Sequence, residues 1–323
     1  MKSKAGEKNT ACKYKPFNNT GLFPVFVLLM FFSFACFSCK PRSSAKNNLR
    51  ATGRTGGELR LVSLAPSLSL IVHALGADRM MAGVTADCPI IFKGKEKPVS
   101  IGRYNTMPDL ETLIRLKPGL VLVPFESRPV LKHLKKLNLN YLLVKSDKLQ
   151  DVIKAITLVS NAIGFKKQGE KLIQVMQSRL DRIETAVRPL DKPKVLLLIG
   201  RGDDEPSRMF AVGPGSYLDD IIKASGGRNI MANSPAAFPQ ISAEDVIGLK
   251  PDVIIEVVDE KRGGICKKRI IDSWRSLDTI PAVRLKRVFI FDDPRILIPG
   301  PNVVDWIDKV ARVLHPEIAS ALN

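Results

Sequence analysis

The sequence predicts an α/β fold of two similar lobes with mainly parallel sheets, joined by a single long helix. Three observations lead to this expectation. Short apolar runs alternate with amphipathic stretches from Leu59 onward, one long amphipathic segment interrupts the alternation, and one pattern recurs on both sides of that segment. Strands that alternate with helices are typical of βαβ units, in which parallel strands lie side by side.

The first half of the alternation contains four apolar runs short enough to be buried strands. They lie at 59–64, 81–85, 119–125 and 140–145. Helices are expected between them, beginning at Pro66-Ser67, over 109–116 and over 130–137. Gly76 ends the first of these and Pro118 the second, because glycine favours the helix C-terminus and proline cannot continue a helix.

The longest predicted helix covers residues 165–188. Its apolar residues recur every three or four positions and share one face; they are Leu172, Met176, Leu180, Ile183 and Val187. Pro189 ends the helix. About 24 residues rising 1.5 Å each give about 36 Å, enough to span a domain. A new strand is expected at 195–200, where the alternation restarts.

An internal repeat links the two halves. The string ETLIRLKPGLVL (111–122) matches EDVIGLKPDVII (244–255) position by position, without a gap. Each copy reads as a helix, a Lys-Pro stop and a buried strand. A small βαβ unit can recur by chance, but the shared E-x-x-I-x-L-K-P pattern favours two related lobes.

The N-terminal segment 1–38 indicates an export signal. Five lysines within positions 1–20 precede an uncharged, mostly apolar run of about 16 residues, shorter than the roughly 20 that a membrane-spanning helix needs. The run ends Ala35-Cys36-Phe37-Ser38-Cys39, which resembles a loose bacterial lipobox and predicts lipid attachment at Cys39. Cys36 is a second candidate. An uncleaved anchor and ordinary signal cleavage are the alternatives, and each of these readings places the rest of the chain outside the cytoplasm.

Residues 39–58 predict a flexible tether, because they are rich in Ser, Asn, Gly, Lys and Arg and contain one large apolar residue, Leu49. The chain has a net charge of +18. Of this charge, +4 lies in the signal, +4 in the tether and +10 in residues 59–323. No nucleic-acid partner is expected, since the basic residues are dispersed and not interleaved with aromatics. The N-terminal charge suits translocation and contact with anionic lipid.

Motifs of catalysis, cofactor binding and metal binding are missing from the sequence. It contains no P-loop, no G-x-G-x-x-G, no H-x-x-x-H and no nucleophile elbow, and its three histidines are scattered. Neither an enzyme nor a resident cofactor or metal is therefore expected. Arg201-Gly202-Asp203 spells an adhesion tripeptide, which leaves a surface adhesin as a minor alternative.

Two further features have open interpretations. Cys88 and Cys266 are the only cysteines beyond residue 39; one disulfide would be possible, but two thiols are the favoured interpretation. Residues 212–216 precede a predicted helix, and their backbone amides are placed to hold an anion. A loop with a helix cap is the favoured interpretation of this segment.

Residues 59–317 resemble the extracytoplasmic substrate-binding proteins of ABC importers for vitamin B12, ferric siderophores and haem. The similar segments occur in the family's order, at 60–85, 108–118, 225–230, 239–246, 299–305 and 314–317. The resemblance implies lobes at 59–164 and 190–323, a rigid linking helix at 165–189, and a ligand cleft between the lobes. It also implies a non-catalytic, lipid-anchored protein that delivers a corrinoid or ferric chelate to an ABC permease and its ATPase subunits.

The resemblance extends to individual residues. A glutamate at the start of a surface helix on each lobe docks onto arginines of the permease in this family, and the matching residues are Glu111 and Glu244. The alternative is that these acids only stabilise the helix dipole. Loops at strand ends are expected to contact the ligand; they contain Pro66, Ser67, Arg103, Tyr104, Phe125, Arg201, Phe238 and Arg295.

Some of these residues suggest a ligand chemistry. Tyr104 and Phe238 match positions where the B12 binders often carry tryptophan, which suits a flat macrocycle. Arg201 and Arg295 suit carboxylates, phosphate or catecholate. Two aromatic positions of the B12 binders are missing, at 86–88 and 292–295, which leaves a ferric chelate or haem open. A chelatase-like enzyme on a related two-lobed scaffold is the alternative function.

Overall fold

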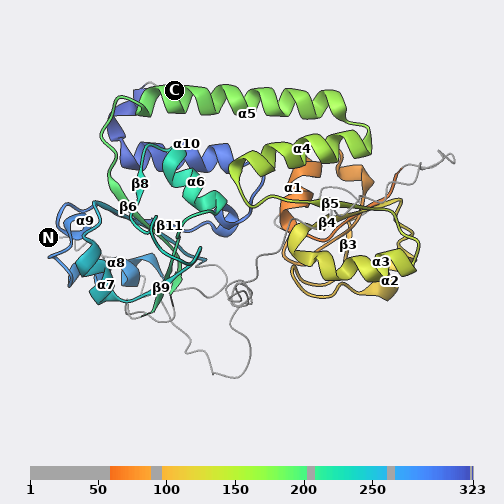
Figure 1. Ribbon diagram of the computed structural model, residues 1–323, viewed down its shortest axis with the longest axis horizontal. Coiled ribbons are helices and arrows are strands. Elements are labelled where there is room, and N and C mark those ends of the chain that lie inside the picture. Colours follow the sequence, from red (N-terminus) through yellow and green to blue (C-terminus); the bar gives the residue numbers. More distant parts are fainter. Residues whose placement is uncertain (1–58, 89–96, 202–207, 260–265, 321, 323) are drawn as a thin grey trace, which may run out of the picture. The chain divides into compact units, whose positions relative to one another are not determined.

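The computed structural model describes residues 59–88, 97–201, 208–259, 266–320 and 322 (Figure 1). The predicted signal (1–38), the lipidation site Cys39 and the predicted tether (39–58) lie outside the described residues, so these expectations stay predictions.

The first half of the structure is built on a parallel sheet. Its strands are β1 (Leu61–Ser63), β2 (Met81–Val84), β3 (Val99–Ser100), β4 (Leu120–Pro124) and β5 (Tyr141–Val144), in the order β3-β2-β1-β4-β5. All four strand pairs are parallel. Every residue of β4 is buried, as expected for a strand covered on both faces of a parallel sheet.

Helices cover both faces of this sheet (Figure 1). α1 (Pro66–Ala74) and α4 (Leu149–Ile163) contribute buried residues to one hydrophobic cluster. α2 (Leu110–Arg115) and α3 (Leu131–Lys136) contribute to a different one, on the other face. A 3₁₀ segment, Phe125–Val130, leads from β4 into α3.

The second half contains a mixed sheet. Its strands are β6 (Lys194–Arg201), β7 (Met209–Ala211), β8 (Arg228–Asn229), β9 (Gln240–Ile241), β10 (Val253–Val257) and β11 (Val288–Phe291). The order is β11-β10-β6-β7-β9, with β8 also paired to β6. β8, β10 and β11 extend the parallel ladder, whereas β7 runs antiparallel to both β6 and β9.

The helices of the second half also divide between the faces of its sheet. α6 (Tyr217–Ala224) and α10 (Val303–Leu314) pack in the same hydrophobic cluster as α1 and α4. α7 (Ala243–Leu249), α8 (Lys267–Arg275) and α9 (Pro281–Arg284) pack in a separate one. Short 3₁₀ segments follow β11 at Pro294–Leu297 and α10 at Pro316–Ser320.

α5 (Lys166–Val187) is the longest helix in the described part of the chain, and it packs against α4, α6 and α10 (Figure 1). Its buried residues Met176, Ile183 and Val187 belong to the cluster that also contains α1, α4, α6 and α10. One continuous hydrophobic cluster therefore includes helices from both halves of the sequence.

The α/β fold class with mainly parallel sheets is confirmed. The helix expected at 165–188 is α5, and the strand expected at 195–200 is β6. The two copies of the repeat form the same structure, because β4 and β10 begin and end at matching positions of the two copies. Lys117 and Lys250, which follow the two repeated helices at matching positions, adopt left-handed φ values of 47° and 52°. The lobe boundaries stay a prediction.

No helix in the described ranges combines the length and the apolar character needed to cross a membrane.

Candidate ligand-binding site

The carboxyl ends of the parallel strands gather most of the predicted ligand residues. In an open parallel sheet these ends lie along one edge, where ligands of α/β proteins usually bind. Ser67 follows β1, Tyr104 follows β3 and Phe125 follows β4, so the first sheet presents all three at the same edge. In the second half, Arg201 ends β6 and Arg295 follows β11, whose carboxyl ends also share an edge.

Pro66 and Ser67 open α1 and are both buried. Proline suits the first helical position because its fixed φ is helical and its missing N–H needs no partner there. Ser67 is only 5% exposed. The structure thus gives these two residues a role in starting the helix, and leaves little of either side chain at the surface.

Tyr104 is half-buried, while its neighbour Arg103 is exposed. The backbone N–H of Tyr104 donates to Asp87 Oδ2 over 2.8 Å, and its ring packs against the large hydrophobic cluster. Burial, followed by the charges of Glu126 and Asp147, raises the pKa of Tyr104. The phenol therefore stays neutral.

Phe125 and Glu126 follow β4 directly. Phe125 is half-buried, and the guanidinium of Arg128 lies 3.9 Å from the centre of its ring. Glu126 is exposed as a residue, but partial withdrawal of its carboxyl from water, together with a hydrogen bond to Asp147, raises its pKa to about 7. This edge of the first sheet therefore carries an acid that titrates near neutral pH.

Residues of the second half meet this edge through Tyr217. The Tyr217 hydroxyl donates to the backbone oxygen of Ile296 over 2.7 Å. Burial raises the pKa of Tyr217, and Tyr104 adds to the shift, so the two phenols lie near each other. A hydrogen bond joins the halves nearby: the N–H of Leu149, the first residue of α4, donates to Asp220 Oδ2 over 2.9 Å.

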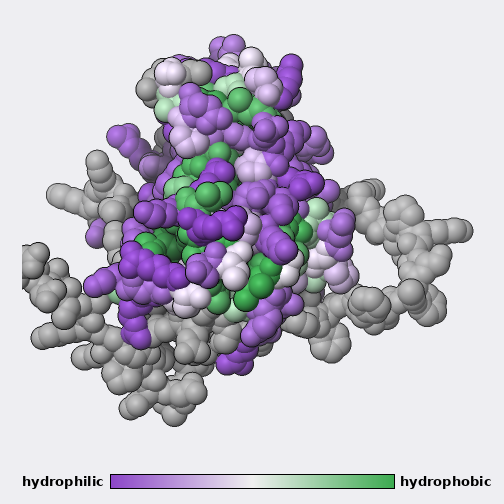
Figure 2. All heavy atoms as spheres, turned by 90° about the vertical axis from the view of Figure 1, so that its left-hand side faces the viewer, coloured by the Kyte–Doolittle hydropathy of each residue, from purple (hydrophilic) through white to green (hydrophobic). Residues whose placement is uncertain are grey.

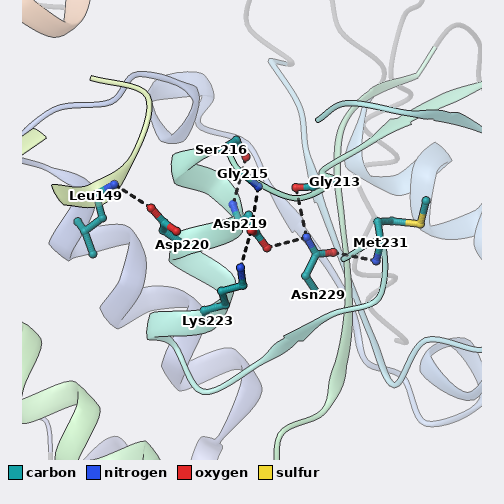
Figure 3. Close-up of polar contacts among 9 residues, drawn as sticks. All are labelled: Leu149, Gly213, Gly215, Ser216, Asp219, Asp220, Lys223, Asn229 and Met231. Atoms are coloured by element: carbon teal, nitrogen blue, oxygen red, sulfur yellow. Dashed lines mark hydrogen bonds and ion pairs between the residues drawn. The ribbon is translucent and has the colours of Figure 1, made fainter. Parts of the chain in front are cut away.

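The loop 213–216 before α6 is fixed by a polar cluster (Figure 3). Ser216 caps α6 by accepting from the N–H of Asp219. Asp219, 1% exposed, accepts from the N–H of Gly215 at 3.1 Å, from Asn229 Nδ2 at 2.9 Å and from Lys223 Nζ at 2.7 Å. Although burial acts to raise the pKa of Asp219, the hydrogen bonds from Lys223 and Asn229 hold it below its usual value.

These bonds decide between the two interpretations of residues 212–216. The amides of Gly215 and Asp219 donate to side chains of the cluster, and that of Gly213 donates to the backbone oxygen of Ala237 over 2.8 Å. The segment is therefore a capped loop, and these three amides are not available to an anion.

Phe238 lies beside this loop. Its segment is held by two backbone bonds, from Gly213 to Ala237 and from Ala211 to Pro239. A side chain at position 213 would collide with the carbonyl oxygen of Ala236, so glycine is needed for this close approach. Phe238 is half-buried against the large hydrophobic cluster, to which Tyr104 also contributes.

The structure places Arg201 in a buried ion pair. Its side chain is 3% exposed, and its Nε and Nη2 donate to the two carboxylate oxygens of Glu256, each over 2.5 Å. Arg201 Nη1 donates to Ser273 Oγ, and the Trp274 indole N–H donates to Glu256 over 3.0 Å. This guanidinium is held in the protein interior, so the structure does not support the predicted role of Arg201 as a ligand contact.

Arg295 is exposed but already paired. Its Nε and Nη2 donate to the carboxylate of Asp293 over 2.8 and 2.5 Å, and 61% of its side chain is exposed. The hydrogen bonds from Arg295 lower the pKa of Asp293. An anionic ligand would therefore have to share this guanidinium with Asp293.

Glu111 and Glu244 occupy equivalent places in the repeated helices, each as the second residue, and both are exposed. Neither is the cap of its helix. Asp109 caps α2 by accepting from the N–H of Thr112, and Ser242 caps α7 in a capping box with Asp245. A hydrogen bond from Ser242 lowers the pKa of Glu244, which keeps it ionised.

Cys88 and Cys266 are thiols and form no disulfide, as favoured by the sequence. Among the residues that the structure describes, no group of three or more histidine, cysteine or acidic side chains is placed to hold a metal ion.

Several residues around the candidate site escape sequence reasoning. Tyr217, Asp147 and Asn229 act through partners distant in the chain, namely Ile296, Glu126 and Asp219, and no local pattern marks them. Asp219 does carry a signal, because Ser216-x-x-Asp219 has the spacing of a helix cap followed by an acid.

One family model and several curated relatives match most of this chain. The family model described as "Periplasmic binding protein" matches residues 61–294. The ABC transporter substrate-binding lipoprotein YvrC of Bacillus subtilis is 25% identical over 263 residues, covering 80% of each chain. The cobalamin-binding protein of Halobacterium salinarum is 22% identical, covering 79% of this chain and 69% of its own.

Solved structures share the fold. The periplasmic heme-binding protein RhuT from Roseiflexus sp. RS-1, in its apo form, superposes with a TM-score of 0.67 at 23% identity, covering 83% of this chain and all of its own. The family model spans well over half of the sequence. The chain therefore belongs to the periplasmic binding protein family.

Proposed function

We propose that this protein is the substrate-binding component of an ABC importer, which captures a metal chelate outside the cytoplasm and delivers it to the permease. The observation that carries the proposal is the family match over residues 61–294, on a structure that gathers aromatic and polar side chains at the carboxyl ends of its strands. The proposed chelate classes are corrinoids, ferric siderophores and haem. Relatives named for cobalamin and for haem support these classes.

The proposed ligand cleft lies where the two halves meet, near Tyr104 and Tyr217. Tyr104 and Phe238 are the proposed aromatic contacts, because each is half-buried and offers part of a flat ring at the edge of the hydrophobic cluster. Phe125 and Arg103 are further proposed contacts from the first half, and Arg295 from the second. Pro66 and Ser67 contribute chiefly by fixing the start of α1 at this edge.

Docking to the permease is proposed for Glu111 and Glu244. Fixed carboxylates at equivalent positions of two similar halves can align both halves on a two-fold symmetric transporter. Their helices are capped by other residues and both glutamates are exposed, although Glu244 also accepts a hydrogen bond from Ser242. Lipid attachment at Cys39 is the proposed anchor that keeps the protein beside its permease at the membrane; YvrC is itself named a lipoprotein.

Ligand binding is tested by titrating the full chain, purified in detergent, with cyanocobalamin, haemin and a ferric catecholate. Equilibrium dialysis measures the bound fraction of each probe. One probe is expected to bind with a Kd of about 1 μM or tighter, that is about −8 kcal/mol. Tyr104→Ala and Phe238→Ala are each expected to weaken it about tenfold. Leu158→Ala, an exposed apolar residue of α4, is the matched control. Weak and equal binding of all probes would contradict the proposal.

A further inference from the structure

We propose that Ile114 and Ile247 are docking residues for the permease, each forming with the neighbouring glutamate a small two-part patch. The N-terminal patch consists of Glu111 and Ile114, and the C-terminal patch of Glu244 and Ile247. The proposed occupant of each patch is an arginine on one of the membrane-spanning subunits of the permease, together with an apolar side chain beside it. This inference rests on the proposed function and extends it to residues with no assigned role.

The first observation is the exposure of the two isoleucines. Ile114 is 50% exposed and Ile247 is 37% exposed, and they occupy the same position in the two copies of the internal repeat. A single exposed apolar residue needs no explanation, and Figure 2 shows hydrophobic residues scattered among hydrophilic ones over the end of the molecule that bears α9. Exposure of an apolar residue at two equivalent positions does need an explanation.

Loose packing is not the explanation. The residues just before the isoleucines, Leu113 and Val246, are both 0% exposed, so each helix is tightly seated on its sheet. After each helix the chain turns at a lysine in the left-handed conformation, at the same position of the repeat. The two helices are thus held in the same way, and each presents an isoleucine outward.

The second observation is the position of the glutamates. Glu111 and Ile114, like Glu244 and Ile247, are three residues apart on a helix, and side chains at this spacing are neighbours on the helix surface. Each patch therefore places an exposed carboxylate beside an exposed aliphatic side chain.

This pairing suits an arginine better than a lysine. The guanidinium is planar and weakly hydrated, so its edge can bind the carboxylate while its flat face and aliphatic stem lie against the isoleucine. Two such patches on similar halves require two equivalent arginine-bearing surfaces, which a two-fold symmetric pair of permease subunits provides.

Both patches also lie on comparable faces. Leu113 of α2 and Val246 of α7 pack in hydrophobic clusters distinct from the one that contains α5. Each glutamate-bearing helix thus covers the sheet face that α5 does not. Val175 of α5 and Leu158 of α4, which are 51% and 42% exposed, provide matched controls on the other face.

The test is photo-crosslinking of the full chain in cells of its native host, which does not depend on the identity of the ligand. p-Benzoylphenylalanine replaces Ile114, Ile247, Val175 or Leu158, one at a time. Positions 114 and 247 are expected to crosslink to a membrane protein with the sequence of an ABC permease, identified by mass spectrometry, and positions 175 and 158 are not. No crosslink from 114 and 247, a crosslink to a second copy of this chain, or equal yields from the controls would overturn the proposal.

A competition experiment measures the size of the effect. Purified Ile114→Asn and Ile247→Asn variants compete with the crosslinking wild-type chain in the same membranes. Each change is expected to raise the half-inhibitory concentration about tenfold, and the double variant about a hundredfold, whereas Val175→Asn leaves it unchanged. Unchanged competition by the double variant would refute the role of the isoleucines.

The two proposals fail separately. Tight binding of a chelate probe without crosslinks from 114 and 247 would leave the proposed function standing and remove the patches. Crosslinks without binding of cyanocobalamin, haemin or the ferric catecholate would support the patches and remove the proposed ligand class.

Discussion

Replacing Arg201 by leucine is expected to destabilise the protein without affecting ligand contacts. Arg201 and Glu256 are 3% and 1% exposed at their side chains, and two hydrogen bonds of 2.5 Å join them. Arg201→Leu removes both bonds and leaves the Glu256 carboxylate buried without its counter-charge. Breaking a buried pair in this way costs about 3–5 kcal/mol.

The expected loss is measurable by thermal unfolding. A domain of this size shifts its Tm by about 2–4 °C per kcal/mol, so Arg201→Leu should lower Tm by roughly 6–20 °C. Far-UV circular dichroism follows the unfolding. Near-UV circular dichroism should change as well, because the Trp274 indole N–H donates to Glu256.

A second substitution separates the two possible roles of Arg201. Arg201→Leu combined with Glu256→Leu removes both charges, so the double variant should recover part of the lost stability, since apolar replacement of a buried pair is often neutral. The recovery is expected to be incomplete, because the buried Trp274 indole N–H loses its acceptor at a cost of about 1–3 kcal/mol. The reasoning would be refuted by a loss below about 1 kcal/mol in the single variant. It would also be refuted by weaker chelate binding at unchanged stability, which would return Arg201 to the ligand site.

Three other changes have expected outcomes of their own. The pKa of Glu126 is raised to about 7 in the folded state, so the folded chain binds this proton more tightly than the unfolded chain. The stability of the wild type should therefore fall as pH rises from about 4.5 to 7. Glu126→Gln should flatten this dependence, measured as Tm from about pH 4.5 to 8. Gly213→Ala should cost at least about 1 kcal/mol in urea unfolding, because its methyl group would collide with the Ala236 carbonyl oxygen. Glu111→Lys with Glu244→Lys should leave chelate affinity unchanged while abolishing uptake, measured with labelled ligand in cells.

Matched variants control each of these measurements. Glu170→Gln, on the exposed face of α5, should leave the pH slope of Tm as in the wild type. Gly200→Ala should be nearly neutral, because no atom of the described residues lies within 4 Å of the added methyl group. Glu184→Lys, also on α5, should not affect uptake. Normal uptake by the Glu111/Glu244 double variant would contradict the docking role of the carboxylates.

The sequence predicts local structure wherever one pattern is strong over several residues. The repeated E-x-x-I-x-L-K-P string locates α2 with β4 and α7 with β10, because the same helix phase and Lys-Pro stop occur twice. The apolar stripe at 172–187 locates α5. In contrast, α4 is absent from the expectations, although Val152, Ile156, Val159 and Ile163 share one buried face. α4 lies between the strand expected at 140–145 and the helix expected at 165–188. The apolar stripe of that longer helix is the more conspicuous pattern, and it draws attention away from α4.

The chemistry of individual side chains is less accessible from sequence. Arg201 and Arg295 both follow strands and look alike in the sequence, yet one is buried against Glu256 and the other is exposed and paired with Asp293. The difference lies in partners 55 and 2 residues away. A partner two residues away is visible in sequence, whereas one on another strand depends on sheet order. Tyr217 and Ile296, 79 residues apart, illustrate the same limit.

The hydrophobic cluster that runs through α1, α4, α5, α6 and α10 has a consequence for energy transfer during import. Rotating one half of the protein against the other would expose side chains such as Met176 and Ile183, at about 25 cal/mol for each Å² of apolar surface. Little of the binding free energy of a chelate is then spent on domain closure. Under the proposed function, loaded and empty forms would then present nearly the same outer surface to the permease, and release of the chelate would have to be driven by the permease and its ATPase subunits acting on a stiff carrier.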